Sequence, residues 1–305
     1  MPSIRDMQDR MKSIESIGQL TRALQTVSAS QVRKMTQYAE NSRHYSELAW
    51  QVLNDLYHED EFYNKTELFL QPDTIESAVV VFISADRGLA GSFPMNVYRE
   101  AYRLEKRLKV PVEYITIGKK GADMLARRRK KIVADFSDLS ATVDFHELRI
   151  LSNIILEEYN RPGLISVYLV YTEFENIARC TPVTRLLVPF FEKYQDFVKT
   201  SPYARGTGCI YEGDPDVIMN SMVKRVIRMM LFHALTSSKA SEHAARMLAM
   251  NKASENSDEI LGQLQLDFNK VRQQMITNDL LDIIGGSEEQ SKNKREMLAE
   301  SGRFD

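Results

Sequence analysis

The stretch LGQLQLDFNKVRQQM, residues 261–275, decides the fold of this chain. Its large apolar residues recur at alternating steps of three and four: Leu261, Leu264, Phe268, Val271 and Met275. Such spacing is typical of a helix that packs its apolar seam against a second helix. Between Pro215 and Gly285 there is no proline, and Gly262 is the only glycine. The sequence therefore predicts one helix of about 70 residues, roughly 100 Å long.

A second stretch without helix breakers lies at the N-terminus, where Gly18 is the only glycine or proline between Pro2 and Pro72. Ser3 is a suitable N-cap, and the helix is predicted to end near Tyr57. Its apolar residues form two runs with steps of three, four and three: Ile4, Met7, Met11 and Ile14, then Ile17, Leu20, Leu24 and Val27. The three-residue step between the runs is interpreted as a local stammer in a coiled-coil seam.

The two end helices would bury their seams most economically against each other, as an antiparallel pair. Two separate bundles of shorter helices are the alternative. Asp214 and Pro215 suit the start of the C-terminal helix, and Gly285 with Gly286 would stop it. We expect a first helix over 1–57, a central domain over 75–200, a second helix over 211–285, and a charged, mobile or partly helical extension over 286–305.

The middle of the chain alternates between strand and helix patterns. Strands are predicted at 77–84, 112–118, 131–136, 165–174 and 179–190, and helices at 95–109, 120–131 and 144–160. This order is typical of an α/β domain, Rossmann-like, with a largely parallel sheet. The last two strands are expected to form a hairpin. The fold class is therefore α/β with long helical arms.

Composition excludes several classes of protein. The net charge of −2 argues against a general nucleic-acid binder. Two cysteines cannot make a disulfide scaffold, and no Cys/His cluster suits zinc. No apolar run approaches the length of a membrane span, and the N-terminus lacks the apolar core of a signal peptide. We expect an intracellular, soluble chain that could dock on a membrane complex.

Two motifs could bind phosphate. The turn SADRGLAGSF, residues 84–93, follows a strand and precedes a helix, but it lacks the GxGxxG and GK[ST] patterns. A close-packed turn is favoured over nucleotide binding. The run Arg127 to Lys131 could bind phosphate or acidic lipid, but a solvated helix end, favoured by the helix dipole, is preferred. No nucleophile, acid–base pair or metal-ligand pattern stands out. The sequence predicts no catalytic residue, no cofactor and no metal.

Residues 246–282 combine an apolar seam with many amide, hydroxyl and charged side chains. Such a surface suits either a partner protein or the polar flank of a two-stranded coil. Four motifs together resemble the gamma subunit of F-type ATP synthases over nearly the whole chain. They are QLTRALQTVSASQVRK (19–34), SADRGLAGSF (84–93), YEGD (211–214) and the long SEHAARMLAMNKASENSDEILGQLQLDFNKVRQQMITNDLLDIIGG (241–286). Leu24 and Ala90 depart from the family pattern, and residues 287–305 run past its usual end.

The resemblance implies a rotor. The end helices would form a shaft inside a ring of three alpha and three beta subunits. The central domain would stand on the epsilon subunit and the membrane ring of c subunits. Proton or sodium flow would turn it and drive ATP synthesis at the beta subunits, while the chain itself does no bond chemistry and binds no nucleic acid. It would be a peripheral membrane protein on the cytoplasmic face of a bacterial membrane, or on the matrix or stroma face of an organelle.

The resemblance also implies which residues contact partners. Beta-subunit loops would meet Arg246, Arg272, Gln273 and Thr277, and an apolar bearing would hold Leu280, Ile283 and Ile284. Leu24, Arg33 and Lys34 complete the predicted contact set. An α/β nucleotide-binding enzyme with helical arms and a free-standing coiled-coil scaffold are the alternative functions.

Overall fold

The computed structural model describes residues 4–58, 76–137, 147–161, 165–189 and 212–301. It divides into two compact units, one of residues 1–24 with 250–305 and one of residues 25–249. Helices α1 (Ile4–His58) and α5 (Pro215–Ser301) each pass through both units. Each end helix therefore contributes to both units, and the predicted division into end helices and a central domain stays a prediction.

Both long helices that the sequence predicts are present, but the predicted C-terminal end of α5 is wrong. α5 runs through Gly285 and Gly286 and ends only at Ser301. Glycine stops a helix when it adopts a left-handed conformation at the C-cap, and among the described residues neither of these glycines has a positive φ. Each therefore acts only as a weak helix former. The extension predicted over 286–305 is thus helical up to Ser301, and residues 302–305 lie outside the described residues.

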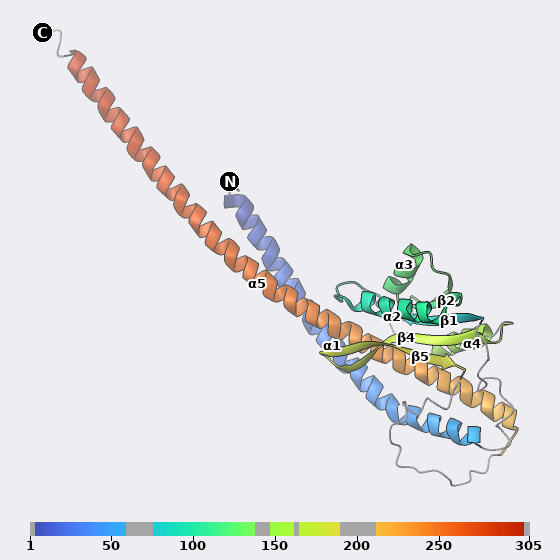
Figure 1. The fold of residues 1–305 in the computed structure, drawn as a ribbon. Helices are drawn as coiled ribbons and strands as arrows, with labels where there is room; N and C mark the ends of the chain where they lie inside the picture. Colours follow the sequence, from blue (N-terminus) through green and yellow to red (C-terminus); the bar gives the residue numbers. More distant parts are fainter. Residues whose placement is uncertain (1–3, 59–75, 138–146, 162–164, 190–211, 302–305) are drawn as a thin grey trace. The chain divides into compact units, whose positions relative to one another are not determined.

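The central sheet has five strands in the order β3-β2-β1-β4-β5. They are β1 (Ser77–Ile83), β2 (Val112–Ile117), β3 (Ile132–Asp135), β4 (Ile165–Asn176) and β5 (Arg179–Val188). All neighbouring pairs are parallel except β4 and β5, which form the predicted antiparallel hairpin. The connecting helices are α2 (Phe93–Leu108), α3 (Lys119–Arg127) and α4 (Glu147–Tyr159) (Figure 1).

Helices cover both faces of this sheet. On one face, Val80 and Phe82 of β1 share a core with residues of α2 and α3, among them Val97 and Leu125. On the other face, Val79, Val81 and Ile83 share a core with residues of α4 and of the first third of α5. Because every side chain of β1 from Ala78 to Ile83 is buried, its sequence is an unbroken apolar run rather than an alternating one.

Candidate functional site

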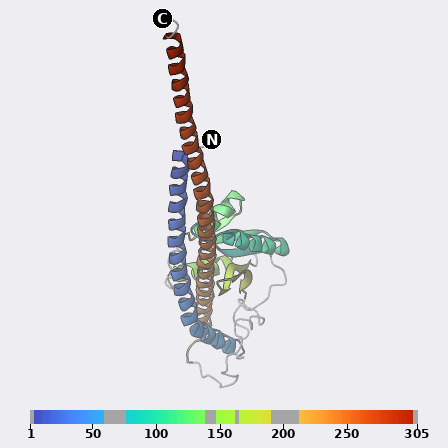
Figure 2. The ribbon, with the colours of Figure 1, turned by 90° about the vertical axis from the view of Figure 1, so that its left-hand side faces the viewer.

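In the first unit, α1 and α5 lie side by side (Figure 2), and the burial of their side chains follows a regular heptad seam. The less exposed positions of α1 are spaced by alternating steps of three and four: Ile4, Met7, Met11, Ile14, Gly18 and Thr21. Those of α5 follow the same rule: Met250, Ser254, Ser257, Leu261, Leu264, Phe268 and Val271. The pairing is antiparallel, because Gly18 lies opposite Ser257 while Arg22 donates to Ser254 Oγ at 3.1 Å. Arg22 also forms an exposed ion pair with Asp258 at 2.6 Å.

The predicted stammer is absent, and the second predicted run is wrong. The seam continues from Ile14 to Gly18 and Thr21, while Ile17, Leu20 and Val27 are 48%, 60% and 58% exposed. Small residues on both helices explain the difference, because a β-carbon on Gly18 would lie only 3.6 Å from Ser257 Cβ. Close helix approach leaves no room for large side chains at this level. Ile14, Leu261, Leu264, Phe268 and Val271 lie on the less exposed side, and Leu24 is half-buried.

From residue 272 to residue 288, the side chains of α5 are exposed. α1 begins at Ile4, and the register of the seam places that residue opposite Val271, so α1 covers nothing further along. A group of apolar side chains is left 48–68% exposed here: Met275, Ile276, Leu280, Leu281, Ile283 and Ile284. Within the described part of the chain, α5 therefore carries an apolar surface that no other element covers, and we call it the α5 apolar end.

Several predicted contact residues gather on this part of α5. Arg272, Gln273 and Thr277 are exposed, and the Thr277 hydroxyl donates to the Gln273 carbonyl at 2.9 Å. Helical spacing puts Leu280 and Ile284 on the same side of α5 as Gln273 and Thr277. On α1, Arg33 and Lys34 are also exposed, with the Lys34 ammonium 5.7 Å from the Tyr38 ring centroid. Their contacts with other chains stay predictions.

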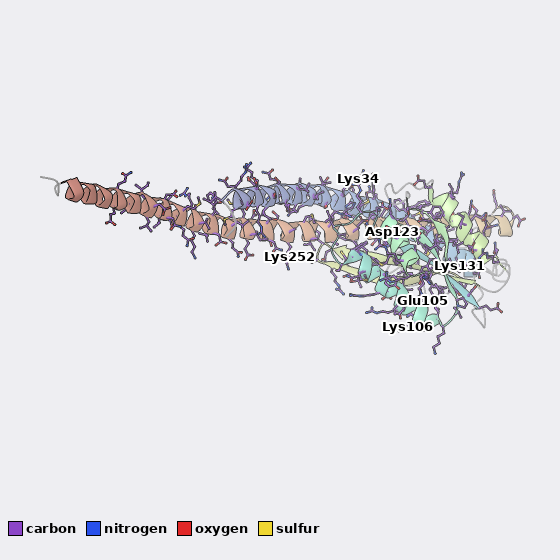
Figure 3. The ribbon with its side chains drawn as sticks, turned by 90° about the horizontal axis from the view of Figure 1, so that it is seen from above. Lys34, Glu105, Lys106, Asp123, Lys131 and Lys252 are labelled. Carbon is purple, nitrogen blue, oxygen red and sulfur yellow. The ribbon has the colours of Figure 1, made fainter. Side chains whose placement is uncertain are left out.

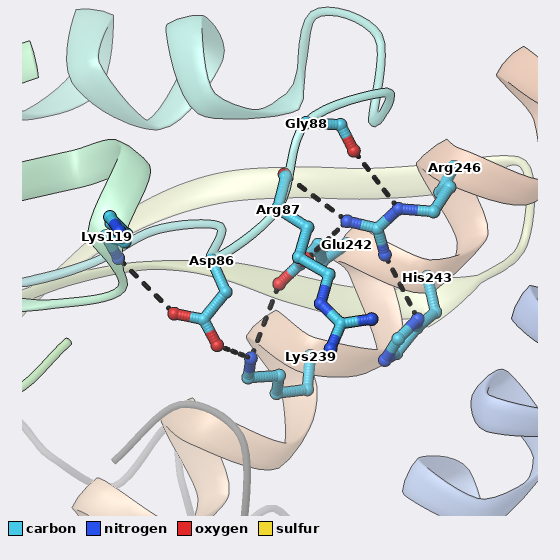
Figure 4. Close-up of polar contacts among 8 residues, drawn as sticks. All are labelled: Asp86, Arg87, Gly88, Lys119, Lys239, Glu242, His243 and Arg246. Carbon is cyan, nitrogen blue, oxygen red and sulfur yellow. Dashed lines mark hydrogen bonds and ion pairs between the residues drawn. The ribbon is translucent and has the colours of Figure 1, made fainter. Parts of the chain in front are cut away.

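The second unit contains a buried ionic cluster between the β1–α2 turn and α5 (Figure 4). We use this name for Asp86, Lys239, Glu242, His243 and Arg246. Lys239 pairs with Asp86 at 3.2 Å and with Glu242 at 3.5 Å, and Arg246 pairs with Glu242 at 2.6 Å. The side chains of Lys239, Glu242 and Arg246 are only 9%, 4% and 9% exposed. Two cations thus balance two carboxylates, of which Glu242 is buried and Asp86 is 19% exposed, as charges removed from water require.

Arg246 lies in this cluster, where its guanidinium also donates to the carbonyls of Gly88 at 3.3 Å and Arg87 at 3.4 Å. The resemblance implies that this residue meets a beta-subunit loop, a contact that the single chain does not test; within the chain its side chain is 9% exposed and paired with Glu242. Its partners in the turn lie 158 and 159 residues away in sequence, so periodicity could not reveal them. Asp86, Lys239 and Glu242 were missed for the same reason, although Asp86 and Glu242 lie within the quoted motifs and Lys239 lies two residues before the last of them.

The turn at residues 84–91 points backbone carbonyl groups at the guanidinium of Arg246. A phosphate-binding loop does the reverse, because it points backbone N–H groups at an anion. The prediction that its own glycines allow close packing is wrong, because a β-carbon would meet nothing within 4 Å at Gly88 and only Ala249 Cβ, at 3.9 Å, at Gly91.

The close approach to this turn is made by the next turn, at Gly118. A β-carbon on Gly118, whose φ is +102°, would lie 2.3 Å from Ser84 O. Asp86 Oδ1 accepts from the Lys119 backbone at 3.3 Å, and Lys120 N donates to Ala85 O at 2.9 Å. The turn is therefore held by α3 as well as by α5.

His243 is the titratable group of the cluster with a strongly shifted pKa. Burial is the largest cause that lowers its pKa; together with the nearby cations Arg246, Lys239 and Arg87, and against the opposing effect of Glu242, it brings the pKa to about 4. The imidazole is therefore neutral at pH 7. Its Nδ1 lies 3.2 Å from Arg246 Nη1 and accepts a hydrogen bond from it.

The described residues contain no group of His, Cys, Asp and Glu that could hold a metal ion. No helix in the described ranges combines the length and apolar character needed to cross a membrane.

Comparisons with known proteins agree with this architecture. The family model described as ATP synthase matches residues 3–289. The ATP synthase gamma chain of Dehalococcoides mccartyi strain CBDB1 is 31% identical over 287 residues, covering 94% of this chain and 99% of that one. The gamma chain of Nitratidesulfovibrio vulgaris strain Hildenborough is 32% identical over 291 residues, with the same coverage.

Solved structures share the fold. A chain of the Euglena gracilis mitochondrial ATP synthase aligns with a TM-score of 0.65 at 17% identity, over 95% of both chains. A chain from the central stalk and c-ring of the Tetrahymena thermophila enzyme aligns with a TM-score of 0.59 at 24% identity, over 77% of this chain and 99% of that one. With the paired end helices and the five-stranded sheet, the sequence matches establish that this chain belongs to the family of ATP synthase gamma chains.

Proposed function

We propose that the chain is the central-stalk rotor of an F-type ATP synthase. The observation that carries the proposal is the α5 apolar end, where Leu280, Ile283 and Ile284 are exposed on a helix that continues without a covering partner. Exposed apolar surface of this extent marks an interaction site. A rotor shaft needs such a surface where it turns inside a ring.

The partners follow from the same assignment. The paired helices would stand inside a ring of three alpha and three beta subunits, with the α/β domain on the epsilon subunit and the c-ring. Arg272, Gln273 and Thr277 support this arrangement because they offer exposed polar groups next to the apolar end. Arg246 is left out of the proposed contact set because its side chain is used inside the chain.

The chain would transmit torque and catalyse nothing itself. Ion flow through the membrane sector would turn the α/β domain, and the asymmetric helix pair would drive the beta sites through their states in turn. The chain would be peripheral to the membrane and would associate with it only through the complex, on the cytoplasmic face in a bacterium.

Co-expression with alpha and beta subunits tests the proposal. We expect the wild-type chain to co-purify with them, and Ile283→Glu/Ile284→Glu to assemble poorly because charge cannot enter an apolar sleeve. Ile150→Glu, at an exposed position of α4, is the matched control and should assemble normally. Wild-type chain that hydrolyses ATP alone, or that self-associates without alpha and beta subunits, would contradict the proposal.

A further inference from the structure

The outer side of α2 and the end of α3 form a strongly basic surface that the rotor assignment does not use. Residues 99–131 contain twelve Lys and Arg but only four Asp and Glu, a net charge of +8 in a chain whose net charge is −2. We define the basic face as six exposed residues of this segment: Arg99, Arg103, Lys106, Lys109, Arg128 and Arg129.

Stacked aromatic and cationic side chains hold the two helices of the basic face together. The Arg128 guanidinium lies 4.1 Å from the Tyr98 ring centroid, and Tyr98 stacks on Tyr102 with centroids 6.3 Å apart. The Lys106 ammonium lies 4.8 Å from the Tyr102 centroid. The stack therefore runs from the end of α3 along α2, and Figure 3 shows Lys106 on the outer side of the domain. Cation–π contacts of this kind fix the positions of long side chains.

The acidic residues of the segment do not neutralise this surface. Glu105 pairs with Lys130, and Glu113 pairs with Lys131 and Arg161, all of which lie outside the basic face. Glu100 pairs with Arg103 at 3.2 Å. In the part of the chain that the structure describes, the other five basic-face residues form no ion pair. Their positive charge is therefore available to another molecule.

Two of these side chains stand at backbone positions that favour glycine. Lys109 and Arg129 have φ values of +56° and +55°, in the left-handed region where glycine is strongly preferred. The helix dipole accounts for a cation near the end of a helix. The helix dipole does not explain why a long cationic side chain, rather than glycine, stands at a position whose positive φ strains any residue with a β-carbon.

We propose that the basic face docks a carboxylate-rich segment of a partner polypeptide within the assembled complex. Guanidinium groups match carboxylates in geometry as well as in charge. The stacking holds the cations at fixed positions, which suits a polypeptide whose carboxylates are also at fixed positions. Lipid headgroups move in the membrane plane, so a lipid surface would bind cations without such positioning. This inference rests on the proposed function, because it takes the partner from the same complex.

Site-specific crosslinking in the assembled complex tests the proposal. Tyr102, which is 42% exposed, is replaced by p-benzoylphenylalanine and irradiated, and the adduct is mapped by mass spectrometry. We expect an adduct with a segment of another subunit in which Asp and Glu outnumber Lys and Arg. Lys106→Glu/Arg129→Glu should lower its yield roughly fivefold or more. Arg179→Glu/Arg225→Glu, at exposed positions outside the face, is the matched control and should not. Adducts confined to lipid or to this chain, or a yield that charge reversal leaves unchanged, would overturn the proposal.

A second variant separates docking from folding. Lys109→Gly/Arg129→Gly removes two charges and relieves two strained conformations, so its melting temperature should equal or exceed that of the wild type while the adduct yield falls. Leu89→Gly is the control, because Leu89 also has a positive φ, +63°, but carries no charge. It should keep the full yield. An unchanged yield in the double glycine variant would contradict the proposal.

The two proposals fail in different ways. Loss of co-purification with alpha and beta subunits would contradict the rotor assignment. A complex that assembles normally but gives no acidic adduct from Tyr102 would contradict only the docking surface.

Discussion

At the scale of single residues, Arg246 ties α5 to the β1–α2 turn, because its guanidinium donates to the carbonyls of Gly88 and Arg87 and pairs with Glu242. Arg246 stood out as a polar residue in a long helix, but its actual partners lie in a turn far away in sequence. Charge type alone cannot distinguish a cation facing a partner subunit from one buried beside Glu242. Only the tertiary fold decides between the two.

Removing one member of the ionic cluster should be costly. Arg246→Met leaves the Glu242 carboxylate buried without its closest cation, so we expect destabilisation of about 3–5 kcal/mol. Arg246→Met/Glu242→Leu removes both charges and should recover much of that loss. Denaturant unfolding of the single and double variants measures the difference. Equal destabilisation in both would show that the ion pair itself is not what the fold depends on.

The cluster should also make stability depend on pH. His243 has a folded pKa of about 4, below its ordinary value, so protons bind the unfolded chain first as the pH falls from about 6.5. The contribution of His243 is therefore complete above about pH 6.5 and is lost towards pH 4. Thermal melts of the wild type and His243→Gln across this range should diverge, with the variant showing the flatter profile. Parallel curves of melting temperature against pH for the two proteins would contradict a contribution of His243 to the pH dependence of stability.

At the scale of elements, periodicity predicted the helices and the strands, whereas residue size decided how the helices pair. The alternation of strands and helices gave the sheet, because a buried parallel strand needs an unbroken apolar run such as residues 78–83. The seam near Gly18 was assigned by apolarity, which selected Leu20 and Val27. Contact between Gly18 and Ser257 depends instead on small side chains, and a hydrophobic pattern does not report that.

Substitutions at Gly18 should test this packing. A β-carbon would meet Ser257 at 3.6 Å, an ordinary van der Waals distance. Gly18→Ala should therefore stabilise the helix pair, by up to about 1 kcal/mol through helix propensity. Gly18→Leu should instead destabilise it by about 1–3 kcal/mol through overpacking. Leu20→Ser, at an exposed position, should change stability by less than about 0.5 kcal/mol. Urea unfolding measures the stability of the three variants. A larger loss of stability for Leu20→Ser than for Gly18→Leu would support the seam that was predicted from apolar spacing.

At the scale of the whole molecule, the proposed function depends on surfaces that no other element covers in the described part of the chain. Arg272, Gln273 and Thr277 are exposed on α5, so replacing all three with Ala should leave the fold intact, with changes near 0.5 kcal/mol at each site. ATP turnover by the assembled complex should nevertheless fall, because polar contacts with the beta subunits would be lost. Circular dichroism provides the folding control. Unchanged turnover would remove these residues from the proposed contact set.

The C-terminal extension gives the last test, and here the structure changes the expectation. Residues 287–301 continue α5, so they add about 22 Å of helix at 1.5 Å per residue. The family model ends at residue 289, and the gamma chain of Dehalococcoides mccartyi strain CBDB1 is matched over 99% of its own length. The rotor function shared with the family therefore needs little of this segment.

Truncation after Gly286 should leave ATP hydrolysis by the assembled complex at the wild-type rate while lowering the helical signal of the free chain. Isolated helical turns are marginally stable. Loss of the segment should therefore hardly change global stability. A truncated chain with clearly raised turnover would instead identify the extension as a brake that docks on the surrounding ring. Clearly lowered turnover would show that this part of the helix takes part in rotation.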